Sequence, residues 1–148
     1  MADRCTLVPG DFTESVPANG DVYLLLRIPH DWDDAQCHAI LATCAANMPE
    51  HAELLVIERP FPETADTDSL AVPWDVHMLC NVGGRERTAS QYCALLTKAG
   101  FEVTGSHSLS LDAYVLRARA RTSGPRSSTS ALVGAADGLS RAWPTSAT

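Results

Sequence analysis

Four side chains in this sequence could together perform acid–base chemistry: His30, Asp11, Glu58 and Glu86. The first three each follow a short apolar run that predicts a strand, and ligands in open α/β sheets bind outside the carboxyl ends of strands. Glu86 follows a Gly-Gly-Arg segment that could fold over the same edge. A carboxylate beside an imidazole fixes its tautomer and stabilises the imidazolium. The set therefore predicts a general base at His30.

Each of these residues also has a purely structural interpretation. A histidine beside a helix start is more often a cap or a surface residue than a catalytic group. Asp11 follows Pro9-Gly10 and could be a turn former. Glu58 and Glu86 could belong to exposed ion pairs of little energetic value. Their candidate partners are Arg27 or Arg59 for Glu58, and Arg85 or Arg87 for Glu86.

The strands that would position these residues follow an α/β pattern. Apolar runs predict parallel strands near Thr6–Val8, Val22–Ile28 and Leu54–Ile57. The run Val22–Ile28 is uninterrupted, which favours a central strand covered on both faces. Phe101–Val103 and Ala113–Leu116 predict two final strands joined by a loop too short for a helical crossover. They are therefore predicted to be antiparallel.

Helical spacing marks the segments between these strands. Asp31 or Asp33 can cap a helix with the apolar stripe Cys37, Ile40, Leu41, Cys44 and Met48. Thr88 and Gln91 form a capping-box pattern before a second stripe, which consists of Tyr92, Leu95, Leu96 and Ala99. Gly100 closes that helix. A loop to about Pro73 precedes a third, short helix over Trp74–Cys80.

Length, charge and composition exclude several classes of protein. The chain has 148 residues, of which 45% are hydrophobic, and this fits one domain. Its formal net charge of -7 opposes nucleic-acid binding. Membrane spans need about 20 apolar residues, which no run approaches, and the first residues do not open a signal peptide. We therefore expect a cytoplasmic protein with no nucleic-acid or membrane partner.

The remaining compositional signals concern cysteines and the carboxyl terminus. The five cysteines contain no Cys-x-x-Cys pair, so they predict buried thiols and no metal site. From residue 121 onward Ser, Thr, Ala, Gly and Pro dominate, and no hydrophobic period survives. We therefore expect one domain over residues 1–120 and a disordered tail over 121–148.

A series of short motifs runs along the chain: Gly10-Asp11-Phe12, Val16-Pro17, His30-Asp31-Trp32-Asp33-Asp34, Leu55-Val56-Ile57-Glu58, Asp75 with His77-Met78-Leu79, Gly83-Gly84-Arg85-Glu86-Arg87-Thr88, and Ala99-Gly100-Phe101. This series closely resembles the carboxyl-terminal half of class I S-adenosylmethionine-dependent O-methyltransferases. The branch concerned holds plant caffeic acid, hydroxyindole and bacterial polyketide O-methyltransferases. The resemblance covers about Asp3 to Ala118 and implies a partial Rossmann-like methyltransferase sheet with a carboxyl-terminal antiparallel strand pair.

The resemblance implies methylation of a hydroxyl on a phenolic or aromatic-polyketide small molecule, with S-adenosylmethionine as methyl donor. It assigns the general base to His30, with Glu58 and Glu86 flanking and orienting the imidazole. It implies no metal, because methyl transfer from a sulfonium is an in-line displacement that needs alignment and a nucleophilic oxygen.

The resemblance also implies binding residues. Contacts to the methyl donor are expected at Asp11, Phe12 and Arg27, the last as a substitute for a lysine that many members carry at position 26. Substrate contacts are expected at Asp31, Met78 and Asn81.

The sequence contains no Gly-x-Gly. Relative to the family it therefore lacks the glycine-rich cofactor turn, and it also lacks the amino-terminal helical dimerisation domain. We expect a partial catalytic domain with an exposed sheet edge where further strands would pair. The alternatives are a non-catalytic remnant and a subunit that pairs with a separate amino-terminal half. A homodimer is the other partner expected.

We predict that these 148 residues alone bind S-adenosylmethionine weakly or not at all. Asp11 and Phe12 would contact only the adenine side, and each lost hydrogen bond weakens binding by about 0.5–1.5 kcal/mol. Titration calorimetry on the purified chain measures this. A micromolar dissociation constant with one-to-one stoichiometry would contradict the prediction.

Overall fold

The computed structural model describes residues 4–64 and 68–121. Its elements are β1 (Val22–Leu26), the short 3-10 helix η2 (Pro29–Asp31), α1 (Asp34–Asn47), β2 (Glu53–Glu58), α2 (Ala71–Asn81), α3 (Ala89–Lys98), β3 (Phe101–Ser108) and β4 (Tyr114–Ala120). The described part ends at Arg121, whose N–H donates to Gly100 O. The predicted disordered tail beyond it lies outside the described residues.

The four strands form one mixed sheet in the order β1-β2-β4-β3. β1 and β2 are parallel, whereas β4 is antiparallel to both of its neighbours. The predicted α/β class and the final antiparallel pair are therefore confirmed. β3 and β4 are longer than predicted, at eight and seven residues, because the apolar patterning used to find them stops before the backbone pairing does.

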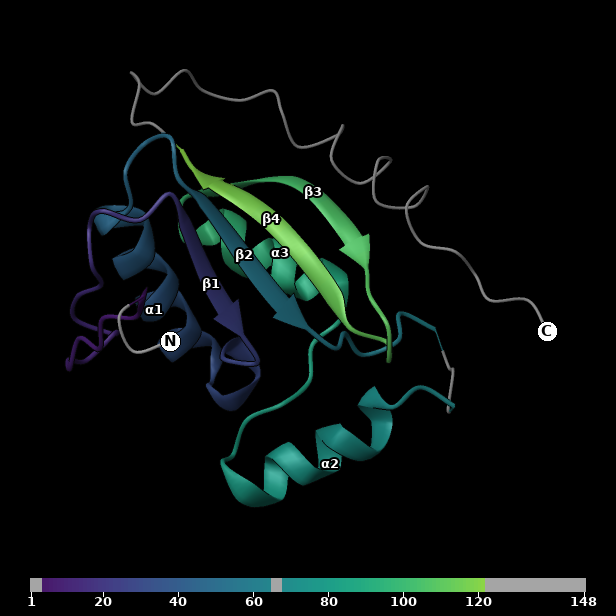
Figure 1. Ribbon diagram of the computed structural model, residues 1–148. Coiled ribbons are helices and arrows are strands. Elements are labelled where there is room, and N and C mark those ends of the chain that lie inside the picture. The colour runs from purple at the N-terminus through teal and green to yellow at the C-terminus, as the bar shows by residue number, and fades with distance from the viewer. Residues whose placement is uncertain (1–3, 65–67, 122–148) are drawn as a thin grey trace.

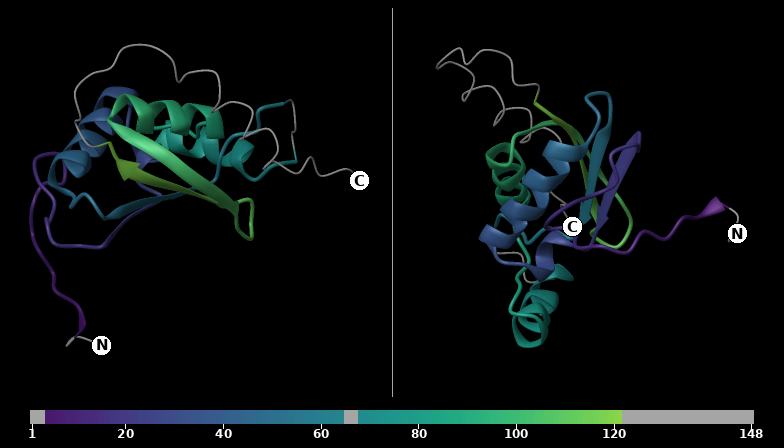
Figure 2. Two further views of the ribbon diagram at one scale, coloured as in Figure 1. Left: turned by 90° about the horizontal axis from the view of Figure 1, so that it is seen from above. Right: turned by 90° about the vertical axis from the view of Figure 1, so that its left-hand side faces the viewer.

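Helices α1 and α3 cover one face of the sheet, as Figures 1 and 2 show. Asp33 caps α1, and its carboxylate accepts the Gln36 N–H while the Gln36 side chain accepts the Asp33 N–H. Thr88 and Gln91 cap α3 in the same reciprocal way, as predicted. Both predicted stripes are buried against the sheet: Cys37, Ile40, Leu41, Cys44 and Met48 from the first, and Tyr92, Leu95, Leu96 and Ala99 from the second.

Helix α2 lies beyond the carboxyl ends of β1 and β2, apart from the other two helices (Figure 1). It begins at Ala71, three residues earlier than the predicted start at Trp74. Pro73 is tolerated there because the first turn of a helix has no intrahelical partner for its N–H groups. In the part of the chain that the structure describes, no helix is long and apolar enough to cross a bilayer.

The predicted strand over Thr6–Val8 is wrong. Leu7 is 93% exposed, and the segment belongs to no strand. The amino-terminal segment, purple in Figure 2, extends away from the sheet. A strand needs a paired neighbour for its backbone groups, and no described strand lies beside these residues. The sequence placed Asp11 at the carboxyl end of a strand, and this expectation is therefore wrong as well.

The strand predicted over Val22–Ile28 is shorter than expected, and its position in the sheet also differs from the prediction. It ends at Leu26, because Arg27 takes a left-handed conformation with φ of 57° and turns the chain into η2. Among the described residues β1 is an edge strand, so the expectation of a central strand covered on both faces is wrong. Leu24 is 54% exposed, and no described helix covers this face of the sheet.

We predict that the purified chain self-associates through the β1 edge. An exposed apolar edge strand without a charge, a proline or a bulge is a template for pairing with another chain. Leu24→Lys places a charge there and should shift the population toward monomer. Sedimentation velocity at increasing concentration measures the shift.

The matched control is Val76→Lys, which makes the same kind of change on the exposed side of α2. A parent chain that stays monomeric, or an equal effect of both lysines, would contradict edge pairing.

Candidate active site

His30 lies in η2, directly after the turn that ends β1, and is 5% exposed. Pro29 begins this short helix, where its fixed φ suits the first helical position. The His30 backbone N–H donates to Glu58 Oε1 over 3.2 Å. His30 is therefore neither a surface residue nor the cap of α1, because Asp33 fills that role.

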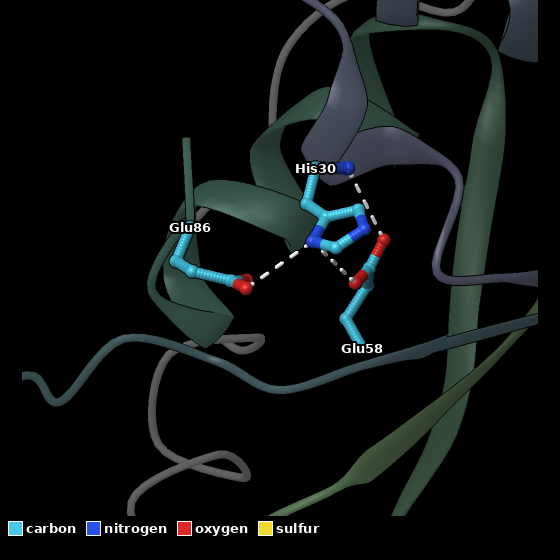
Figure 3. A group of neighbouring side chains, drawn as sticks. All are labelled: His30, Glu58 and Glu86. Atoms are coloured by element: carbon cyan, nitrogen blue, oxygen red, sulfur yellow. Dashed lines mark hydrogen bonds and ion pairs between the residues drawn. The ribbon is translucent and has the colours of Figure 1, made fainter. Parts of the chain in front are cut away.

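Two carboxylates from different elements face the His30 ring (Figure 3). Glu86 Oε1 lies 3.2 Å from His30 Nδ1, and Glu58 Oε2 lies 4.0 Å from the same nitrogen. Glu58 is the last residue of β2, and Glu86 belongs to the loop between α2 and α3. The Glu86 N–H donates to Asp75 Oδ1 over 2.8 Å, which ties that loop to α2. The structure thus brings the three predicted catalytic residues together.

Arg27 provides the positive charge beside these carboxylates. Its guanidinium lies 3.0 Å from Glu86 Oε1 and 3.6 Å from Glu58 Oε2. It also lies over the Trp74 ring of α2, 5.8 Å from the ring centre. Buried carboxylates are stable only when paired, so Arg27 compensates a cluster that would otherwise be strongly anionic. The alternative of exposed ion pairs is wrong for both glutamates, because each is buried.

Burial and pairing change the proton affinities of this cluster. Burial lowers the pKa of His30, but the hydrogen bond to Glu86 and the charge of Glu58 outweigh burial, so the net shift is upward. Burial raises the pKa of Glu58 to about 7, although His30 and Arg27 oppose that shift. Glu58 and His30 lie 4.0 Å apart and each affects the pKa of the other, so they behave as a coupled pair.

The geometry assigns the two ring nitrogens different roles. Nδ1 lies within hydrogen-bond distance of the buried Glu86 carboxylate, and a neutral imidazole that donates to Glu86 carries its proton on Nδ1 and has its lone pair on Nε2. Nε2 lies 3.3 Å from Asp31 Oδ1. At that distance the Asp31 carboxylate forms an ion pair with the ring once Nε2 is protonated. The arrangement can therefore take a proton at Nε2 and stabilise the resulting imidazolium.

The same three residues form a group that could hold a metal ion. One ligand atom each from His30, Glu58 and Glu86 lies within 4.8 Å of the others. The Arg27 guanidinium already pairs with both carboxylates, so a cation is present at this position. The same group can also act as a proton acceptor with its counterions.

The predicted binding residues lie in different surroundings. Asp11 accepts hydrogen bonds from the N–H and hydroxyl of Thr13, which lower the pKa of its carboxyl. Phe12 is partly exposed and packs edge-on against Trp32, with ring centres 5.9 Å apart. Both binding residues predicted on α2 fall near its carboxyl end. Of these, Met78 is buried, and Asn81 is exposed and bonded to the His77 ring.

Two residues that hold the site together, Asp75 and Arg87, were not predicted as site residues from the sequence. Asp75 was noticed only as a member of a motif, yet its carboxylate holds the Glu86 backbone. Arg87 was considered only as an exposed partner of Glu86, yet it is 1% exposed and bonds to the turn that carries His30. The only available signal was the run of charges from Arg85 to Arg87. Such a run is ordinarily a solvated surface.

The chain is similar to several known proteins over part of their length. The sequence model of the O-methyltransferase domain family matches residues 1–102. The 3-amino-4-hydroxybenzoate 4-O-methyltransferase of Streptomyces cremeus is 46% identical over 120 residues, which cover 80% of this chain and 33% of that protein.

Solved structures are similar as well. The mitomycin 7-O-methyltransferase MmcR superposes with a TM-score of 0.75 at 37% identity, covering 80% of this chain and 35% of that one. The O-methyltransferase NcsB1 from neocarzinostatin biosynthesis, in complex with S-adenosylmethionine and 2-hydroxy-5-methyl naphthoic acid, gives a TM-score of 0.70 at 30% identity. That match covers 80% of this chain and 34% of the NcsB1 chain. The chain thus spans about a third of the length of the curated relatives that it matches.

We predict that the chain loses stability as the pH rises from about 5 to 8. The folded-state pKa of Glu58, about 7, lies above its ordinary value of 4.5, and that of His30 is raised as well. Both groups hold their protons more tightly in the folded chain, so their contribution is present at low pH and lost as these pKa values are passed. The contribution of Glu58 to this change in the free energy of unfolding is at most about 3 kcal/mol.

Urea unfolding at several pH values measures this, and Glu58→Gln should flatten the slope. Glu102→Gln, the same change at an exposed residue of β3, is the control. An unchanged slope in Glu58→Gln would show that Glu58 is not a source of the pH dependence.

Proposed function

The chain belongs to the O-methyltransferase family, and we propose that it supplies the general base for S-adenosylmethionine-dependent methylation of an aromatic hydroxyl. The observation that carries the proposal is the contact between His30 Nδ1 and Glu86 Oε1 at 3.2 Å. This contact leaves Nε2 as the basic nitrogen. The acceptor hydroxyl would give its proton to Nε2 as its oxygen bonds to the methyl group.

The counterions support this role for His30. A phenol has a pKa near about 10 and an imidazole near about 6.5, so the proton transfers only as methyl transfer develops. Glu86 and Glu58 raise the pKa of His30, which reduces this mismatch. Arg27 pairs with both glutamates beside the ring, and its charge opposes the upward shift in the pKa of Glu58. Both glutamates favour the imidazolium that forms when His30 takes a proton.

The proposed methyl donor fits residues that flank the base. S-adenosylmethionine supplies a methyl group on a sulfonium, and NcsB1 is one relative whose structure contains it. Phe12 offers an aromatic ring that is 38% exposed, and the lowered pKa of Asp11 keeps its carboxylate as an acceptor. A ring and a carboxylate suit the adenine and its amino group. The Phe12 ring contacts Trp32, close to the base. Arg27 is occupied by Glu58 and Glu86, so its proposed cofactor role would be indirect.

The proposed acceptor is a phenolic or aromatic-polyketide hydroxyl. Asp31 lies at His30 Nε2, where an acceptor hydroxyl must approach, and would contact the substrate there. Met78 and Asn81 belong to α2, whose Asp75 holds the Glu86 backbone, so this helix links the proposed substrate contacts to the base. The 3-amino-4-hydroxybenzoate in the name of one relative and the 2-hydroxy-5-methyl naphthoic acid bound to NcsB1 are of this aromatic type.

The proposed partner is a polypeptide equivalent to the amino-terminal part of the relatives. The chain matches about a third of their length, and β1 exposes apolar side chains on an open edge. Such a surface favours association with further strands. A homodimer is the second candidate.

We predict that His30→Gln lowers the rate of methyl transfer about 100-fold or more, because the acceptor proton loses its base. The assay mixes the chain with the amino-terminal two thirds of the Streptomyces cremeus relative and supplies labelled S-adenosylmethionine. The two aromatic acids named above serve as trial acceptors. The rate should rise with pH as His30 loses its proton, and Glu86→Gln should move that rise to lower pH because it removes the contact that raises the pKa of His30.

His51→Gln is the matched control, since His51 is an exposed histidine whose Nε2 pairs with Asp21. A His30→Gln variant that keeps the full rate would refute the proposed base.

A further inference from the structure

Arg87 is a charged side chain that is almost fully buried, and its side-chain hydrogen bonds are directed at residues 29–34, which form the turn that carries His30. NH1 donates to Pro29 O over 2.8 Å, and NH2 donates to Trp32 O over 2.8 Å. Nε and NH2 also donate to Asp34 Oδ1, over 2.9 and 2.8 Å. The two carbonyls flank His30 on both sides. One planar guanidinium thus spans the whole turn.

The backbone just before Arg87 holds the carbonyl between those two. The Arg85 N–H donates to His30 O over 2.9 Å. Gly84 makes this approach possible, because a Cβ at that position would lie 2.1 Å from His30 O. Any other residue would push the two segments apart. The carbonyls of residues 29, 30 and 32 are therefore all bonded to residues 85–87.

Glu86 stands between these two anchors and points its carboxylate at the His30 ring. The segment that binds the backbone of the turn therefore also carries the carboxylate that orients the imidazole. The distance between Nδ1 and Glu86 Oε1 is set by how the two segments dock. Arg87 makes four of the hydrogen bonds that fix this docking.

Arg87 is not needed to begin α1. Asp33 and Gln36 already satisfy the start of that helix through a capping box. The buried face of α1 packs through Cys37, Ile40, Leu41 and Cys44. Helix α1 can therefore form without the guanidinium contacts of Arg87, whereas the position of His30 depends on them.

We propose that Arg87 is the positioning residue of the base: its guanidinium locks the turn 29–34 so that the His30 imidazole stays on Glu86. The inference rests on the proposed function for its catalytic meaning. The lock itself is a property of this chain and can be measured without a methyl donor.

The test compares Arg87→Lys with Arg85→Gln in the full chain. Lysine keeps the positive charge but loses the planar fork. Arg85→Gln removes the other guanidinium on Asp34, at 2.7 Å, and leaves all three carbonyl contacts in place. The readout is the imidazole ¹⁵N NMR signal of His30, which reports both its tautomer and its titration. The signal is assigned by its loss in His30→Gln.

In Arg87→Lys we expect the pKa of His30 to fall toward its ordinary value and the preference for a proton on Nδ1 to weaken. Release of the ring from Glu86 removes the hydrogen bond that raises the pKa of His30. In Arg85→Gln both quantities should stay as in the parent. A folded Arg87→Lys variant with the parent's titration and tautomer overturns the proposal.

Asp34→Asn keeps the test decisive if Arg87→Lys does not fold. Asp34 is exposed on α1 and pairs with both arginines, so the effect of Asp34→Asn beyond that of Arg85→Gln reports on the two hydrogen bonds that Arg87 donates to Asp34. A His30 titration that is identical in Asp34→Asn and Arg85→Gln would show that these bonds do not hold the turn and would overturn a lock over residues 29–34.

Activity separates this inference from the proposed function. In the reconstituted assay Arg87→Lys should lower kcat roughly tenfold or more, with the KM for the methyl donor unchanged. A full rate in His30→Gln defeats the proposed function, and the NMR titration still decides the role of Arg87.

Discussion

The burial of two carboxylates beside one imidazole is the constraint on which the rest of this structure depends. Glu58 and Glu86 are 3% and 5% exposed, and ions so far from water need counterions and hydrogen bonds. Arg27 and His30 provide them from other positions in the chain, and Asp75 accepts the Glu86 backbone N–H and so holds that residue in place. One oxygen of each glutamate accepts no hydrogen bond among the described residues. Each of these two oxygens therefore remains able to accept a further hydrogen bond.

The sheet topology brings these groups together. Parallel pairing of β1 with β2 places the residues after Leu26 beside Glu58, at one edge of the sheet. Arg27 accepts a left-handed backbone there, which costs about 1–2 kcal/mol for a non-glycine residue. This turn starts η2 and sets His30 against Glu58. The conformational strain is therefore located where the base is presented.

The loop between α2 and α3 completes the cluster from the other side. It is bonded to η2 by backbone and guanidinium contacts and to α2 by Asp75. Helix α2 lies beyond the strand ends, apart from α1 and α3 (Figure 1). A displacement of α2 would move the Glu86 backbone and so change the proton affinity of His30. The proposed substrate helix and the base are thus mechanically linked.

The sequence by itself determined the elements whose causes are local. The caps at Asp33 and Thr88 and both buried helix stripes depend on residues within a few positions of one another, so periodicity finds them. The placing of His30 and Glu58 after apolar runs was equally readable. Only the tertiary structure decided that Arg27 meets Glu86, 59 residues away, and that Arg87 is buried. It alone decided that β1 is an edge and that Thr6–Val8 forms no strand, because strand pairing and ion pairing depend on neighbours that are distant in the sequence.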